Sequence, residues 1–498
     1  MGFLNALQAM GGLNPASGWE AYLMFPLAEP TSKSTAAAKN KKKPDDGHKI
    51  IRVWLNVEDP TADQLKVVGV EKIDLMDYKV TPEMKRRYLY RDKVGANTTW
   101  GFSPILKIGK PKKDIDARLK FLVGDTGNWR QDHESTYNKL KHRLLDDFET
   151  RGVLSPGSVE AIMNDLSDHV NHVCELFDGN GSFIILFGVN NDGMFQYPGD
   201  LPPFVAYFRD KLATNIQNSH GNGDAFSGNC YCCGQQSTSL ATLDKVFKFA
   251  TFDKVNVLPG LEKENRIKVQ PVCQRCLEDL TAGRELIERE LTDKSKIPRL
   301  NIWVIPEVVG PQESGKVLAQ AVRKLKSKEN VASGMGAEAE RRLFDKLKEQ
   351  GSGIVFHFLF WEPSYAQERV HLMLEDVPPS RLAALDTAWK SVCKDMDFEW
   401  DTTLDGAFSA IYTTCIALSG AGDDRGDKAV MRDFVIKIIG KMMMGQKVSS
   451  ESFKAMFVGR IPKLVFDSAQ WRYVKGIARK AQVVVEFFER VNRRVASI

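Results

Sequence analysis

The sequence predicts an α+β multidomain protein with a mixed N-terminal domain, an inserted cysteine-rich subdomain and an all-helical C-terminal bundle. Three observations support this fold class. The chain has 498 residues, whereas single hydrophobic cores stop growing near ~250–300 residues. Two C-x2-C pairs lie near its middle, and strand-like runs of β-branched residues end before Pro378. We therefore expect several domains, of which the last is built from helices alone.

The N-terminal domain is expected to span residues 1–215 and to mix strands with helices. Residues 31–47 are basic and of low complexity, which predicts a mobile loop. Hydrophobic periodicity and β-branched content predict strands over 50–55, 65–70 and 183–189, and helices over 135–152 and 158–177.

The cysteine-rich subdomain, residues 216–290, has the most restricted chemistry in the chain. Cys230/Cys233 and Cys273/Cys276 offer four thiolates to one tetrahedral zinc ion, and Gly234 can adopt the positive φ of a tight knuckle turn. Four sulfur ligands leave no position open for water. The pattern therefore predicts a structural zinc site that hydrolyses nothing.

Two features of the cysteine-rich subdomain leave alternatives open. Cys232 lies inside the first pair and leaves the identity of one ligand in question. Two disulfides or four unrelated thiols are the alternative to a metal site, and a reducing compartment disfavours the disulfides. Between the two pairs, residues 245–249 alternate in hydrophobicity as a strand does.

The rest of the chain divides into a mixed α/β segment, residues 291–376, and a helical basic domain, residues 377–498, whose size and helical content resemble those of a separate small subunit of a larger complex. In the mixed segment, Pro306 is expected to end the strand that begins at residue 300. The predicted elements are a helix over 277–291, strands over 300–306, 354–361 and 369–375, a helical stretch over 312–350, and C-terminal helices over 381–396, 404–418, 428–444, 450–458 and 468–496.

The net charge of +5 conceals an asymmetry between the two ends of the chain. Residues 425–498 hold 16 Lys/Arg against 6 Asp/Glu, a balance of +10, which leaves −5 for residues 1–424. Such a basic region is typical of a surface that faces nucleic-acid phosphate, and a solvated helix face is the alternative. The candidate phosphate contacts on the last helix are Arg472, Lys475 and Arg479.

A second candidate DNA contact lies in the N-terminal domain. Basic and aromatic residues alternate over 85–91, and a loop of small polar residues follows at 95–104. Basic groups fix phosphates, while Asn and Thr can meet base edges, although such a loop is also an ordinary turn. The candidate phosphate contacts are Arg86, Arg87, Arg91 and Lys93. The candidate residues for reading a short DNA sequence motif through base edges are Asn97, Thr98 and Thr99.

Familiar catalytic motifs are not found in the sequence. It has neither a P-loop nor a G-x-S-x-G pattern. Asp423 and Asp424 resemble the paired carboxylates of palm-type polymerases, which hold two metal ions. They lie between two helical patterns, where a solvated loop explains them. The sequence therefore predicts that the protein is not an enzyme.

Scattered histidines do not change this expectation. Asp165, His169 and His172 share one predicted helix face, but polar helix surfaces often carry such residues. His357 and His371 lie in strand-like runs and are expected to be satisfied histidines of a sheet rather than ligands.

The sequence contains no apolar run long enough to span a bilayer, and its N-terminal residues lack the features of a signal peptide. We therefore expect a cytoplasmic protein with no membrane contact, in a compartment that keeps its eight cysteines reduced.

Several of these features together resemble the large subunit of the type I-B CRISPR Cascade, a surveillance complex guided by a short CRISPR RNA. The resemblance rests on the basic segment 87–91 with Ser103 and Pro104, on the cysteine pairs with residues 246–254 between them, and on residues 375–382. The doubled Cys232 and Cys233 depart from a plain knuckle.

The resemblance implies a non-catalytic subunit of an antiviral complex. Such a subunit docks on the crRNA-bearing backbone and small subunits and reads a protospacer-adjacent motif (PAM) in double-stranded DNA. It also helps to open the duplex, stabilises the R-loop with its displaced single strand, and recruits a helicase-nuclease. In this family an internal start can produce the helical part separately, and Met373 or Met396 is suitably placed. A polymerase- or cyclase-like large subunit that uses Asp423 and Asp424, and a zinc-bearing protein scaffold, remain as alternatives.

Overall fold

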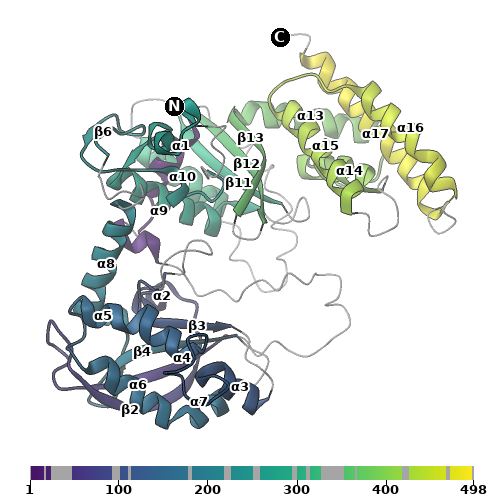
Figure 1. Cartoon of the computed structure of the whole chain (residues 1–498). Helices are drawn as coiled ribbons and strands as arrows, with labels where there is room; N and C mark the ends of the chain where they lie inside the picture. Colours follow the sequence, from purple (N-terminus) through teal and green to yellow (C-terminus); the bar gives the residue numbers. More distant parts are fainter. Residues whose placement is uncertain are drawn as a thin grey trace. The chain divides into compact units, whose positions relative to one another are not determined.

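The computed structural model describes residues 2–15, 18–23, 48–91, 101–109, 114–177, 182–217, 226–250, 258–293, 300–309, 314–326, 353–364, 367–417, 425–466 and 471–495. They form two compact units. The first unit is Trp19–Ala225, and the second unit is Met1–Gly18 together with Phe226–Ile498. The fold is a multidomain mixture of helices and sheets that ends in helices (Figure 1). The expected loop 31–47 lies outside the described residues.

The unit Trp19–Ala225 is built on a five-stranded sheet of order β2-β1-β4-β3, with β5 paired to β4. β1 and β4 run parallel, and the other pairings are antiparallel. The predicted strands 50–55 and 183–189 lie in β1 and β4, whereas the predicted strand 65–70 overlaps only the first four residues of β2, which continues to Asp77. The strands are β1 (His48–Val57), β2 (Val67–Asp77), β3 (Ile105–Gly109), β4 (Ser182–Asn191) and β5 (Met194–Gln196).

Helices accompany this sheet and include both of the predicted helical stretches. The stretch 135–152 is one helical run with a wider π turn in its middle, and the stretch 158–177 is divided at His169. The elements are η1 (Gly18–Tyr22), α2 (Pro82–Tyr88), α3 (Ile115–Val123), α4 (Thr136–Leu140), η3 (Lys141–Leu145), α5 (Asp146–Thr150), α6 (Ser158–Asp168), α7 (Val170–Leu176), η4 (Pro198–Asp200) and α8 (Pro202–Gln217).

The second unit begins with α1 (Phe3–Gly11), which packs against α9 (Gln274–Glu290). Two glycines permit the close approach of the helices. A Cβ on Gly283 would lie 2.0 Å from the Leu7 carbonyl oxygen, and one on Gly11 would lie 2.0 Å from that of Asp279. The sequence analysis placed residues 1–18 with the N-terminal domain, whereas the structure packs them with the cysteine-rich part.

A four-stranded antiparallel sheet of order β10-β11-β12-β13 forms the centre of the second unit. The predicted pairing of 354–361 with 369–375 is confirmed. The elements of this part are β6 (Gly228–Asn229), β7 (Gln236–Ser237), β8 (Leu240–Ala241), η6 (Leu243–Lys245), η8 (Pro259–Leu261), η9 (Lys263–Lys268), β9 (Val272–Cys273), β10 (Thr292–Asp293), β11 (Asn301–Val308), α10 (Ser314–Lys326), β12 (Ile354–Ser364) and β13 (Gln367–Val377).

Two local predictions in this part are wrong. Residues 245–249 form no strand, because the chain turns after η6 and Phe247 is buried against Phe3 and stacks on Phe249. The strand β11 continues through Pro306 to Val308. β10 pairs only with Ile302 and Trp303, so Pro306 has no described strand on that side that would need its missing N–H.

The chain ends in the helices α13 (Pro379–Asp395), α14 (Leu404–Ala417), α15 (Arg425–Met443), α16 (Ser450–Phe466) and α17 (Trp471–Val495), in agreement with the predicted C-terminal helical domain. The buried face of α17 is centred on Ile477, Ala481, Val484 and Phe488. None of the described helices combines the length and the apolar content that crossing a membrane requires.

The crossing of α1 and α9 can be tested by adding one methyl group. We expect Gly283→Ala to destabilise the protein by about 1–3 kcal/mol, because its Cβ would overlap the backbone of α1. The matched control is Gly476→Ala in α17, where no atom lies within 4 Å of the new Cβ. That change should stabilise its helix by up to about 1 kcal/mol. Urea unfolding followed by tryptophan fluorescence measures both, and equal midpoints would contradict the close crossing.

Candidate metal centre and nucleic-acid contacts

The four predicted cysteine ligands come together from two different kinds of local structure. Cys230 and Cys233 lie in the turn between the short paired strands β6 and β7, where Gly234 has φ +70° as the knuckle requires. Cys273 ends β9 and caps the N-terminus of α9, which places Cys276 in the first turn of that helix. One knuckle is therefore a hairpin turn, and the other is a strand-to-helix junction.

The distances between these thiols suit a tetrahedral ion. All four Sγ atoms lie within 4.8 Å of one another, and Cys233 Sγ is 3.9 Å from Cys273 Sγ. A regular tetrahedron with Zn–S bonds of about 2.3 Å separates its sulfurs by about 3.8 Å. The four cysteines can thus hold a metal ion, and a sulfur-only donor set favours zinc.

Backbone N–H groups around the cluster stabilise the thiolate form of Cys230. Burial raises the pKa of Cys230, but N–H groups of Cys233, Cys273 and Cys232 donate to its sulfur and bring the pKa down to about 7. Burial raises the pKa of Cys273 and of Cys276. In the metal-free protein these two groups are therefore thiols at neutral pH, and an incoming cation must displace their protons.

Cys232 does not belong to the cluster, although the sequence left this open. The group of four comprises Cys230, Cys233, Cys273 and Cys276. Burial, together with the charge of Cys230, raises the pKa of Cys232 to about 12, so it stays a neutral thiol.

The surrounding helices hold the centre in place. In α1, Gln8 donates from Nε2 to Cys276 Sγ (3.3 Å) and to the Asp279 carboxylate (3.4 Å). Farther along α9, the partly buried Arg284 binds the carboxylates of Glu288 and Glu368 and donates to the Val246 carbonyl. Sequence analysis did not identify Gln8 or Arg284, because Cys276 and Glu368, their partners on other elements, are distant from them in the chain.

The three described candidate phosphate contacts of the segment 85–91 are all engaged within their own unit. Arg86 pairs with Glu20 (3.2 Å), and Arg87 pairs with Asp200 (2.8 Å) while its guanidinium covers Tyr197. Arg91 is buried between the rings of Tyr22 and Phe102, and burial lowers its pKa to about 10.

Lys93, Asn97, Thr98 and Thr99 lie outside the described residues, as do Asp423 and Asp424. Among the described basic residues of the segment 85–91, only Arg91 has a buried nitrogen, Nη1, with no hydrogen-bond partner.

The C-terminal basic residues are partly neutralised by neighbouring acids. Arg490 binds Asp395 (2.7 Å) and Glu486 (3.1 Å), and Arg432 binds Glu362 (2.8 Å). Arg479 is exposed and donates to the Met396 carbonyl. Arg472 and Lys475 belong to α17, but their side chains lie outside the described part. The surface that remains positive is thus smaller than the net charge of the domain indicates.

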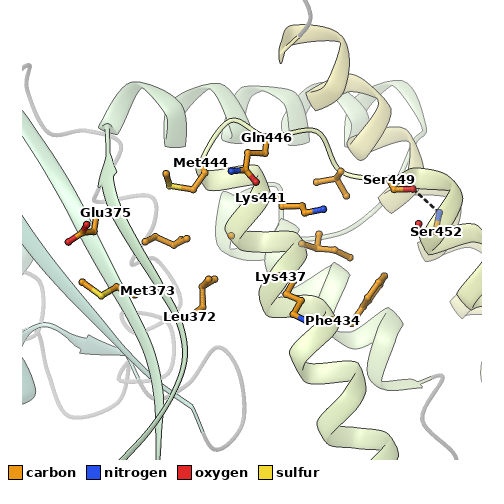
Figure 2. Close-up of a pocket in the computed structure, with 14 residues that line it drawn as sticks. Leu372, Met373, Glu375, Phe434, Lys437, Lys441, Met444, Gln446, Ser449 and Ser452 are labelled. Atoms are coloured by element: carbon orange, nitrogen blue, oxygen red, sulfur yellow. Dashed lines mark hydrogen bonds between the residues drawn. The ribbon is translucent and has the colours of Figure 1, made fainter. Parts of the chain in front are cut away.

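A groove of about 720 Å³ lies between β13 and the helices α15 and α16, and the sequence analysis did not anticipate it (Figure 2). Its walls are largely apolar and include Leu372 and Phe434. The exposed Lys437 and Lys441, one helical turn apart on α15, line it as well. Ammonium groups beside an apolar wall suit a ligand that carries both negative charge and apolar surface, as a nucleic-acid strand does.

His169 and His172, the histidines of the candidate helix face, lie close to backbone carbonyls. Val70 N–H donates to Asp165 Oδ2 (2.6 Å), His169 Nδ1 lies 2.8 Å from the Asp165 carbonyl, and His172 Nε2 lies 3.1 Å from the Ile73 carbonyl. Asp165 and His172 thus bind the backbone of β2 rather than sharing a metal.

Comparison with known families gives a match in the middle of the chain. Residues 227–377 match the family model described as CRISPR-associated protein TM1802 (cas_TM1802) central domain. The matched segment runs from the first knuckle to the last residue of β13 and therefore contains the four clustered cysteines and the second sheet. It covers less than half of the chain and supports a CRISPR-associated protein. None of the curated proteins matches the chain.

The metal centre can be tested with two adjacent cysteines. We expect Cys233→Ser to lose the bound metal and to lower the unfolding temperature, because removal of one thiolate breaks a site whose binding energy contributes to folding. Cys233 is exposed, so the change itself disturbs no core packing.

The control for this experiment is Cys232→Ser, which should keep about one equivalent of zinc per chain, because Cys232 lies outside the cluster. Elemental analysis of both purified variants measures the outcome. Equal metal content in the two variants would refute the assignment.

Proposed function

We propose that this chain is the non-catalytic large subunit of a type I-B CRISPR Cascade complex. In this role it recognises the PAM in double-stranded DNA, aids duplex opening, stabilises the R-loop and recruits a helicase-nuclease in the cytoplasm. The observation that carries the proposal is the match of residues 227–377 to the central domain of a CRISPR-associated family. The matched segment contains the cysteine cluster on which the sequence resemblance also rests.

The chemistry of the cysteine cluster supports a structural role for this segment. Four thiolates saturate a tetrahedral ion, so the centre offers no position at which it could activate water. Its ligands join a hairpin turn to the start of α9, and Gln8 of α1 binds the same cluster. A metal here stabilises the arrangement of these elements and performs no reaction.

A CRISPR complex divides recognition between RNA and protein, and this division fits the proposed role. Base pairing with the guide reads the long target, so the protein needs to contact only a few base pairs and the DNA backbone. The polar loop 95–104 supplies residue types that meet base edges, and the basic C-terminal domain supplies sequence-independent charge. The groove with Lys437 and Lys441 adds an amphipathic surface for the displaced strand.

The two rival functions predict different behaviour. A polymerase- or cyclase-like subunit would have a catalytic activity that is lost when Asp423 and Asp424 are replaced. The proposed subunit uses neither carboxylate, so the same replacement would leave its DNA binding unchanged. A zinc-bearing scaffold would bind partner proteins but not duplex DNA. Duplex binding that weakens steeply with rising salt therefore favours the proposal over the scaffold.

Motif reading is assigned to Asn97 with Thr98 and Thr99. Asn97→Ala should cost about 1–3 kcal/mol on duplexes with the correct motif and little on duplexes without it, because the lost contact is to a base edge. The measurement is equilibrium binding of the assembled complex to paired targets that differ only in the motif.

Two controls accompany this measurement. Lys93→Ala should weaken both targets alike, since a phosphate contact does not depend on sequence. Asn164→Ala removes an exposed asparagine from α6 and should change neither. If Asn97→Ala weakens both targets equally, the loop is not the reader.

The C-terminal basic surface is assigned to the DNA backbone and the displaced strand. Reversal of Arg472, Lys475 and Arg479 to Glu should weaken target binding broadly across sequences and reduce its salt dependence, because fewer phosphates are neutralised. Reversal of Lys437 and Lys441 to Glu tests the groove in the same assay.

The matched control reverses three lysines that are exposed elsewhere in the chain, namely Lys66, Lys120 and Lys268. It changes the net charge by the same amount as the α17 variant. If the control weakens binding as much as the α17 variant does, the effect is one of overall charge and not of this surface.

A further inference from the structure

Three potential metal ligands meet on three neighbouring strands of the second sheet. Glu307 lies in β11, His357 in β12 and Asp376 in β13, and one ligand atom of each lies within 4.8 Å of the others. His357 is fully buried, Glu307 is 7% exposed, and Asp376 is open to solvent. The cluster therefore has a buried side and an accessible side.

Strand pairing explains how these residues meet. His357 pairs with Ile305, and Glu307 follows two residues later in β11, so both can project from the same face of the sheet. On the other side of β12 the register slips between Phe356 and Phe358. Asp376 lies in the resulting bulge with φ +57°, and bulges commonly redirect a side chain.

The polar groups of this cluster are incompletely satisfied. His357 Nε2 lies 2.6 Å from Glu307 Oε2, but Nδ1 of the same buried ring has no hydrogen-bond partner among the described residues. Within the described part of the chain, no Lys or Arg forms an ion pair with Glu307 or Asp376, and the ion-pair partner of Glu307 is His357. Two carboxylates beside one imidazole, without a basic side chain to neutralise them, favour a bound cation.

We propose that Glu307, His357 and Asp376 bind one divalent transition-metal ion, at a site separate from the four cysteines. An imidazole nitrogen with two carboxylate oxygens suits the series from Mn²⁺ to Zn²⁺. Mg²⁺ and Ca²⁺ prefer oxygen ligands alone. Three protein ligands leave coordination positions open on the side of the exposed Asp376, where water or an anionic oxygen of a ligand can bind.

The test removes one ligand without disturbing the core. Asp376→Asn deletes the charge of an exposed residue, and asparagine tolerates the left-handed backbone at that position. The matched control is Asp397→Asn, since Asp397 is also exposed and also left-handed, with φ +46°. Full-length protein whose cysteine site is loaded with zinc is dialysed against Mn²⁺ and, separately, against Zn²⁺, and the bound metal is counted.

We expect wild type and Asp397→Asn to bind one equivalent beyond the metal held by the cysteines, with at least one of the two ions. Asp376→Asn should bind that equivalent at least tenfold more weakly, since even indirect supports of a metal site change affinity by about 10–100-fold. If wild type binds no additional equivalent of either ion, or Asp376→Asn binds it as tightly as wild type, the proposal is overturned.

Discussion

The second unit depends on three constraints that fix α9 to its surroundings. Its N-terminus is tied to the cysteine cluster through Cys273 and Cys276. Its middle is crossed by α1 at a distance that only glycine permits. Arg284, the residue after Gly283, connects the same helix to Glu368 in β13. Burial alone would lower the pKa of Arg284, but the charges of Glu288 and Glu368 raise it, so the guanidinium stays charged within the protein. A metal ion bound by the four cysteines would strengthen the first of these three constraints.

The net charge of a region overstates the number of basic side chains that are free to bind phosphate. The C-terminal region has a balance of +10, yet Arg490 and Arg432 are bound to acids. The same holds in the first unit, where Arg87 is held by Asp200 and Arg91 is buried. Charges that are paired internally contribute little to phosphate binding, because their fields are already compensated. Exposed groups such as Lys437 and Lys441 therefore matter more to the proposed DNA contacts than the total does.

Local sequence patterns predicted most of the secondary structure because hydrophobic periodicity and β-branched content act over a few residues. The paired strands β12 and β13 and most of the C-terminal helices agree with their predicted ranges to within a few residues, whereas α16 continues past the predicted end at residue 458 to Phe466. The prediction failed where packing overrode the local pattern. Residues 245–249 alternate as a strand does, but Phe247 is buried against Phe3 from the other end of the chain. Pro306 ends no strand, because no described partner needs its N–H.

By itself the sequence determined the four cysteines of the cluster, since C-x2-C spacing brings two thiols together through one local turn. It also determined Gly234 as the residue that allows this turn. Only the tertiary structure excluded Cys232 from the cluster, placed α1 on α9, and brought Glu307, His357 and Asp376 together. The Phe3 N–H donates to Glu375, 372 residues away. Contacts of this separation leave no periodic trace in the sequence, because they depend on strand register and helix packing rather than on neighbouring residues.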